Sequence, residues 1–251
     1  TDAAAADEVV TAMFTVGELP PPPAPAVFFS EYAEGSEGSN KYVEIYNGTG
    51  SSVDLSDYQV WGSNNGGGWK AERQHDLTGT LSDGDVYVLA ADAAVQAILD
   101  ETDLALAYES ALHYNGDDAI GLAKDNGTGT FELIDVIGVS DVDPGSGWDV
   151  AGTTNGTKDH TLIRKSTVTA GNADWSASAG TDTDDSEWLV DLPPTNSYTP
   201  VTLGSHPHSI TFLPTIGSIA FEPSSPTEAD DVTVSAVITD DGTIASATLT
   251  Y

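Results

Sequence analysis

Short apolar runs separated by turn-forming residues fill most of this chain, and their spacing restricts the possible fold more than any other feature. Between residues 27 and 206, segments such as KYVEIYNG, DVYVLAA, AIGLAKD and FELIDVIGV alternate with clusters of Gly, Asn, Asp and Ser. In KYVEIYN, alternation places Tyr42, Glu44 and Tyr46 on one face of a half-buried strand. Regularly spaced short strands with turn signals predict an all-β sandwich.

One segment departs from the strand pattern, and the ends of the chain differ from its middle. ADAAVQAILDETDLALAYESAL predicts a short helical insertion in which Asp92 caps the first turn. We divide the chain into an N-terminal strand with a proline-rich spacer (residues 1–26), the sandwich (27–208) and a second, incomplete β unit (209–251). SHPH, at the second boundary, is interpreted as a linker.

The last part has too few strands to close a sandwich. Its apolar runs predict strands at about 216–222, 231–239 and 244–251, whereas a complete immunoglobulin-like sandwich needs about seven. The N-terminal TDAAAADEVV lacks the basic region of a signal peptide, so we expect it to be the start of a processed or shortened chain.

Several motifs occur in an order that resembles the bacterial branch of the lamin-tail domain, an immunoglobulin-like β-sandwich. The stretches are FFSEYAEGSEGSNKYVEIYNGTGSSVDLSDYQVW, LTGTLSDGDVYVLAA, YNGDDAIGLAKDNG, LIDVIGV and KDHTLIRKSTVTAGNADW. The resemblance implies a fold of lamin-tail type in a secreted or cell-surface protein, with no catalytic residues carried by the fold. Residues 209–251 resemble the opening strands of bacterial immunoglobulin-like repeats.

The charge balance limits the partners of the chain. It holds 40 Asp and Glu residues against 7 Lys and Arg residues, a formal net charge of −33. Such a surface repels nucleic-acid phosphates and anionic membranes, so neither is an expected partner. No apolar run approaches the ~20 residues that span a bilayer, so membrane insertion is not expected. Salt or divalent cations screen self-repulsion of this size, which favours an extracellular or cell-surface location in a saline or marine setting.

Three acidic loops are candidate calcium sites, because Ca²⁺ prefers closely spaced carboxylate oxygens. NGDDA is equally suited to a turn, in which Asn115-Gly116 adopts positive φ and an aspartate binds the turn amides. DNG at residues 125–127 fits a hairpin turn. The other two candidate loops, DVDPG (residues 141–145) and DTDDSE (residues 182–187), do not match an EF-hand. For all three candidates, a solvated loop without a metal ion is the alternative interpretation. The candidate ligands are Asp117, Asp118, Asp141, Asp143, Asp182 and Asp184.

The sequence has no recognisable catalytic motif, and no enzyme is predicted. Cysteine is absent, and no nucleophile elbow, HExxH or phosphate-binding glycine loop occurs. Tryptophans exposed in a row would stack on carbohydrate, a candidate ligand, and Trp69 in its Gly-rich loop is the best of them. The alternative is that Trp148, Trp175 and Trp188 anchor loops to the sandwich.

These patterns leave three functional hypotheses. The first is a non-catalytic structural or adhesion module of a secreted or cell-surface protein. The second is a subunit of a homo-oligomer or filament assembled by strand addition through the N-terminal strand and the C-terminal β unit. The third is the accessory part of a secreted nuclease or other hydrolase. The expected assembly strand contains Val9, Val10, Met13, Phe14 and Val16.

Overall fold

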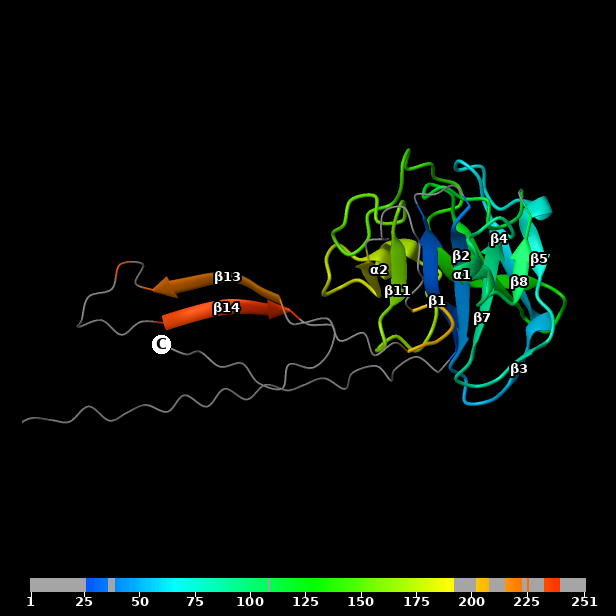
Figure 1. Cartoon of the computed structure of the whole chain (residues 1–251), viewed down its shortest axis with the longest axis horizontal. Helices are drawn as coiled ribbons and strands as arrows, with labels where there is room; N and C mark the ends of the chain where they lie inside the picture. The colour runs from blue at the N-terminus through cyan, green and yellow to red at the C-terminus, as the bar shows by residue number, and fades with distance from the viewer. Residues whose placement is uncertain are drawn as a thin grey trace, which may run out of the picture.

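A computed structural model of the chain describes residues 26–35, 39–107, 109–191, 202–207, 215–222, 225 and 233–239. Two sheets form most of it (Figure 1), and every strand pair is antiparallel except β7–β8. In spatial order, the six-stranded sheet contains β12 (Trp188–Asp191), β11 (Thr161–Arg164), β1 (Val27–Glu34), β2 (Lys41–Asn47), β7 (Val86–Ala91) and β8 (Leu104–Leu106). The four-stranded sheet contains β10 (Phe131–Ile137), β9 (Ile120–Asp125), β4 (Tyr58–Gly62) and β5 (Gln74–Asp76).

The core lies between these sheets and follows the alternation of their strands. Val43 and Ile45 of β2 join a cluster with Val60 of β4 and Leu122 of β9, and all four side chains are 0% exposed. A bulge in β1 between Phe29 and Glu31 shifts the register of the β1–β2 pair. The all-β, immunoglobulin-like sandwich predicted from the sequence is therefore confirmed.

The outer face of the six-stranded sheet is also covered. Tyr42 belongs to a second buried cluster, in which Ile98 of α1 (Gln96–Leu99) and Leu203 pack with it. Glu44 is 0% exposed on the same face. The prediction of a half-buried β2 is therefore wrong, because a distant helical turn and residues 202–207 cover the face that alternation assigns to solvent.

The predicted helical insertion is present but short. The helix α1 spans four residues, and its N-cap is Val95, whose backbone N–H donates to Asn40 Oδ1 at 2.9 Å. The backbone N–H of Asp92 instead donates to the carbonyl oxygen of Leu106 at 3.0 Å, which ties the segment to β8. The expectation that Asp92 caps the helix is therefore wrong, since Asp92 continues the end of β7.

Small elements complete the described chain. Within it, β13 (Thr215–Glu222) and β14 (Thr233–Thr239) pair only with each other and agree with two of the three strands expected near the C-terminus. The third expected strand, at 244–251, lies outside the described residues, as do Val9, Val10, Met13, Phe14 and Val16. The remaining elements are β3 (Val53–Asp54), a 3-10 turn (Leu55–Asp57), a second 3-10 turn (Ala71–Arg73), β6 (Thr80–Leu81), α2 (Trp175–Ala179), β13 (Thr215–Glu222) and β14 (Thr233–Thr239).

Candidate binding site

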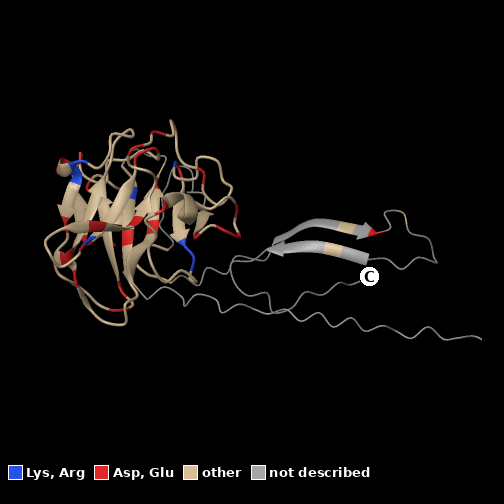
Figure 2. Cartoon of the chain, turned by 180° about the vertical axis from the view of Figure 1, so that it is seen from behind, with Lys and Arg blue, Asp and Glu red and all other residues tan. Residues whose placement is uncertain are grey.

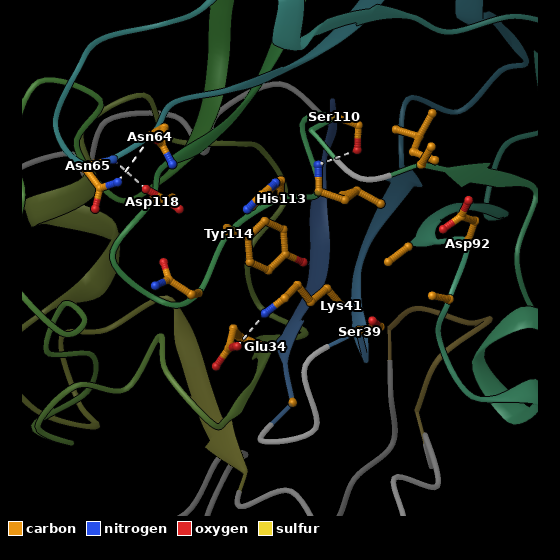
Figure 3. Close-up of a pocket in the computed structure, with 17 residues that line it drawn as sticks. Glu34, Ser39, Lys41, Asn64, Asn65, Asp92, Ser110, His113, Tyr114 and Asp118 are labelled. Atoms are coloured by element: carbon orange, nitrogen blue, oxygen red, sulfur yellow. Dashed lines mark hydrogen bonds and ion pairs between the residues drawn. The ribbon is translucent and has the colours of Figure 1, made fainter.

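A pocket of about 530 Å³ lies at one end of the six-stranded sheet (Figure 3). The adjoining ends of β1, β2, β7 and β8 form one side of it. The loop residues 64–65 and the segment 110–118 form the other side. Because these strands end at the same edge of the sheet, the sandwich brings together side chains that are far apart in the sequence.

A buried ion pair lies in this pocket. Lys41 Nζ donates to Glu34 Oε1 at 2.5 Å, and the two side chains are only 10% and 7% exposed. The other carboxylate oxygen of Glu34 accepts the backbone N–H of Asp159 at 2.7 Å. Lys41 Nζ also lies 5.6 Å from the centre of the Tyr114 ring. The pair is therefore held by two strands and two loops.

Tyr114 fixes the loop side of the pocket to the core. Its hydroxyl lies 3.0 Å from the carbonyl oxygen of Ala33 and 2.8 Å from that of Tyr42. Its ring stacks on Tyr32 with centroids 4.9 Å apart. Burial lowers the pKa of the neighbouring His113, and the positive charges of Arg73 and Lys41 lower it further.

The NGDDA loop adopts part of the turn predicted for it. Gly116 has φ of +94°, and a Cβ there would lie 2.5 Å from the Cβ of Lys158, so only glycine fits. Asp118 Oδ1, however, accepts the backbone N–H of Asn65 at 2.6 Å and thus binds a second loop. With its amide nitrogen facing the carboxylates, Asn115 donates to Asp117 and Asp118.

The structure brings three of the six candidate calcium ligands into one neighbourhood. Burial raises the pKa of Asp117, and the charges of Asp118 and Asp143 raise it further. Burial also raises the pKa of Asp118, with an opposing effect of the Asn65 N–H group and Arg73. Asp143 itself is exposed, and its Oδ1 accepts the backbone N–H of Gly145 at 2.7 Å.

The other three candidates lie apart. Asp141 is exposed, and Asp182 and Asp184 lie together in an exposed loop, where Asp182 Oδ1 accepts the Asp184 N–H at 2.8 Å. Within the described ranges, no group of three or more His, Asp or Glu side chains is arranged to hold a metal ion. Calcium binding stays a prediction.

A buried charge network that the sequence did not reveal joins the two sheets. Arg164 of β11 and Asp135 of β10 are both 0% exposed at the side chain, and their N–O distance is 2.5 Å. Arg164 also donates to Glu187 Oε2 at 2.6 Å and to the carbonyl oxygen of Phe29 at 3.0 Å, and its guanidinium lies 3.8 Å from the Trp188 ring centre. Burial raises the pKa of Asp135, and Arg164 opposes that rise.

The tryptophans do not form an exposed row. All five lie in the described residues, and Trp175 and Trp188 are 4% and 0% exposed. Trp69 is half-buried, with its ring centre 6.1 Å from that of Trp61. Trp69 therefore packs over the four-stranded sheet, and carbohydrate stacking on a row of exposed tryptophans stays a prediction without support from their arrangement.

Residues 20–141 match the lamin tail domain. The lamin tail domain has an immunoglobulin-like fold, in agreement with the sandwich described above. The match spans β1 to β10, whereas β11 and β12, which complete the six-stranded sheet, lie beyond it. No immunoglobulin-like repeat was matched at residues 209–251, so that part of the resemblance is not confirmed.

Comparison with curated proteins and with solved structures gave no match. None of the helices in the described residues is long and apolar enough to cross a membrane. The lamin tail domain match and the geometry of the sandwich therefore carry the functional argument.

Proposed function

We propose that this protein is a non-catalytic structural or adhesion module of an extracellular or cell-surface protein. The observation that carries the proposal is the use of buried charge. Arg164 donates to Asp135 and Glu187, while Lys41 donates to Glu34, so these groups connect strands and loops of the sandwich. A side chain bound in this way contributes to the packing of the domain.

The surface charge supports an exterior location. At a formal net charge of −33, self-repulsion is strong in low salt and is screened within about 10 Å at 0.1 M salt. The acidic residues are spread over both sheets and their loops (Figure 2). A chain of this composition stays soluble and apart from polyanions in saline surroundings.

Protease treatment of intact cells that naturally make the protein tests the proposal. We expect the chain to be cleaved on unbroken cells, or recovered from their medium, while a cytosolic marker stays intact. Protection of the chain until the cells are lysed would contradict the location. Turnover of phosphodiester, phosphomonoester or glycoside substrates by the purified chain would contradict the non-catalytic role and favour a hydrolase.

Assembly by strand addition is the second candidate, and the sheet edges favour it. The strands β8 and β12 lie at the edges of the six-stranded sheet, and β13–β14 is a two-stranded sheet within the described chain. Edge strands present backbone groups that another chain can pair with. If residues 1–26 supply the added strand, their deletion reduces the particle size measured by light scattering. Particles of unchanged size would rule out that strand.

A further inference from the structure

We propose that the pocket bounded by Lys41, Asp92 and Asp118 binds a neutral saccharide unit. Its volume of about 530 Å³ falls within the ~300–1,000 Å³ typical of small-molecule sites. The site lies apart from the tryptophans and uses none of them. A sugar ring offers hydroxyl groups at its edge and C–H groups on its faces, so it requires walls with donors, acceptors and apolar surface.

Lys41 supplies the donors. An ammonium group has three N–H donors. Within the described residues, the Lys41 ammonium group donates one hydrogen bond, to Glu34. The side chain is nine-tenths buried, and Figure 3 shows it in the pocket between Glu34 and Tyr114. Burying a donor without a partner is costly. An oxygen of a bound hydroxyl group satisfies the remaining N–H groups.

Asp118 and Asp92 supply the acceptors. Asp118 lies on the loop side of the pocket, held by the backbone N–H of Asn65 at 2.6 Å, so its carboxylate is positioned before a ligand arrives. Asp92 follows the end of β7 and is exposed. In the part of the chain that the structure describes, no protein donor contacts the Asp92 carboxylate. Both carboxylates can therefore accept hydrogen bonds from ligand hydroxyl groups.

Small apolar side chains line the wall between these polar groups. Ala91 ends β7 and Ala93 follows it, Leu106 ends β8, and Leu112 belongs to the loop segment. Such a wall contacts the C–H face of a ring and buries it from water. The alternation of polar and apolar lining matches a ring with hydroxyl groups around it.

The charges select a neutral ligand over a charged one. An anion would meet Asp92 and Asp118, while Lys41 is already paired with Glu34 at 2.5 Å. A cationic ammonium group has donors and no acceptor, so it cannot accept the remaining N–H groups of Lys41. A wholly apolar ligand would leave the Lys41 donors without acceptors. A neutral ligand whose hydroxyl groups both donate and accept meets none of these difficulties.

Isothermal titration calorimetry of the full chain tests the proposal. The probes are D-glucose, D-galactose, D-mannose and their β-1,4-linked oligomers, with D-glucuronate and D-glucosamine as charged counterparts. We expect at least one neutral sugar to bind one-to-one with a Kd of about 1 mM or below. D-glucuronate should bind at least ~10-fold more weakly, since its carboxylate would meet Asp92 and Asp118. D-glucosamine should bind no more tightly than the neutral sugar, since its ammonium group cannot accept from Lys41.

Two variants locate the binding site. Asp92→Ala and Asp118→Asn should each weaken sugar binding by at least ~10-fold. Asp57→Asn, which removes an exposed carboxylate outside the pocket, should leave it unchanged. Circular dichroism verifies that both variants fold. Because Asp92 is exposed, Asp92→Ala should fold and still tests the site if Asp118→Asn does not fold.

Three results would overturn the proposal: no neutral sugar binds, a peptide or an anion binds in its place, or both variants bind sugar like the native chain. The proposal does not depend on the proposed structural role. Surface exposure of the chain and occupancy of this pocket are separate measurements, so either can fail alone.

Discussion

At the scale of single residues, buried charge joins the two sheets. Arg164 reaches from β11 to Asp135 on β10, and the Asp135 carboxylate also accepts the backbone N–H groups of Phe29 at 2.8 Å and Asn172 at 3.0 Å. The network holds four segments of the sandwich at one point. Removing one partner of such a pair leaves the other as an uncompensated buried charge.

We expect Arg164→Met to lower the free energy of unfolding by about 3–5 kcal/mol, because Asp135 then lacks its cation. Urea denaturation measures the change. The double variant Arg164→Met/Asp135→Asn should lose less stability than the sum of the losses in the two single variants, since no unpaired charge remains between these positions. Lys124→Met, at an exposed position, is the control and should change stability by no more than about 0.5 kcal/mol. A native-like midpoint for Arg164→Met would show that the network contributes nothing.

Residues that act locally could be predicted from the sequence, whereas this network could not. In DNG, Asp125 Oδ1 accepts the N–H groups of Gly127 and Gly129, both at 2.9 Å, and forms the hairpin turn between β9 and β10. That turn depends on adjacent residues only. Asp135 and Arg164 are 29 positions apart on different sheets. Their pairing is decided by how the sheets pack, which one sequence does not specify.

At the scale of elements, the pairing of β1 with β2 places two carboxyl groups side by side. Glu31 and Glu44 are directly opposite in the register, and both are 0% exposed. The backbone N–H of Gly204 donates to Glu44 Oε2 at 2.7 Å. Burial raises the pKa of Glu44 to about 8, and the charge of Glu31 also raises it.

The groups around this carboxyl pair come from several elements. The hydroxyl of Tyr42 on β2 donates to Glu31, and Ser30 Oγ of β1 donates to Glu44 Oε1 at 2.7 Å. Glu101, which follows α1, lies close to Gly204, where a Cβ would be 2.7 Å from Glu101 Oε2. No described cation forms a salt bridge with Glu44, so its neutral form is favoured.

Stability should therefore fall as the pH rises from about 4.5 to about 8. Between these pH values the folded chain keeps a proton on Glu44 that the unfolded chain releases, so stability falls as the pH rises. Above about pH 8, Glu44 is deprotonated in both states, and its contribution to stability no longer changes with pH. The stability of Glu44→Gln relative to the native chain should rise by up to about 1.4 kcal/mol per pH unit. Chemical denaturation at several pH values measures this rise. Glu72→Gln, at an exposed site, should run parallel to the native chain, and a parallel Glu44→Gln curve would contradict the assignment.

The positions of the strands could be predicted from the sequence because alternation and turn residues are local signals. Which residues cover the outer face of the six-stranded sheet could not be predicted. The faces of β2 agree with the sequence pattern, yet both are buried. The sequence SHPH (residues 205–208), which overlaps the covering residues 202–207, is interpreted as a linker because Pro207 separates its histidines and a domain boundary lies beside it. His206 nevertheless packs edge-on against Phe28 and Tyr46, with ring centres 5.7 and 4.8 Å away. Aromatic contacts over such a sequence separation leave no local pattern.

At the scale of the whole molecule, acidic residues far outnumber their possible partners. The chain has 40 Asp and Glu residues against 7 Lys and Arg residues. In the described chain, Lys41 and Arg164 form ion pairs with Glu34, Asp135 and Glu187. Most carboxylates therefore depend on solvent cations, and we expect any divalent cation to bind at the candidate loops.

We expect calcium to raise the melting temperature and EDTA to lower it. At about 100 times its Kd, one bound Ca²⁺ adds about 2.7 kcal/mol, which corresponds to about 5–10 °C for a domain of this size. A triple variant tests the first group of candidate ligands: Asp117→Asn, Asp118→Asn and Asp143→Asn. A double variant tests the second group: Asp182→Asn and Asp184→Asn. Magnesium at the same concentration is the control for screening. A melting curve that neither calcium nor EDTA moves would argue against any calcium site.

The cover formed by residues 202–207 determines how force enters the sandwich. A pull on the chain beyond Pro207 first meets Gly204, held by Glu44 in the middle of the six-stranded sheet, and Leu203, packed on the same face. Traction therefore reaches β1 and β2 before the edge strand β12, to which the preceding chain is joined. We therefore expect a pull from this end to be resisted first by the Gly204–Glu44 hydrogen bond and the packing of Leu203, before β12 carries any load.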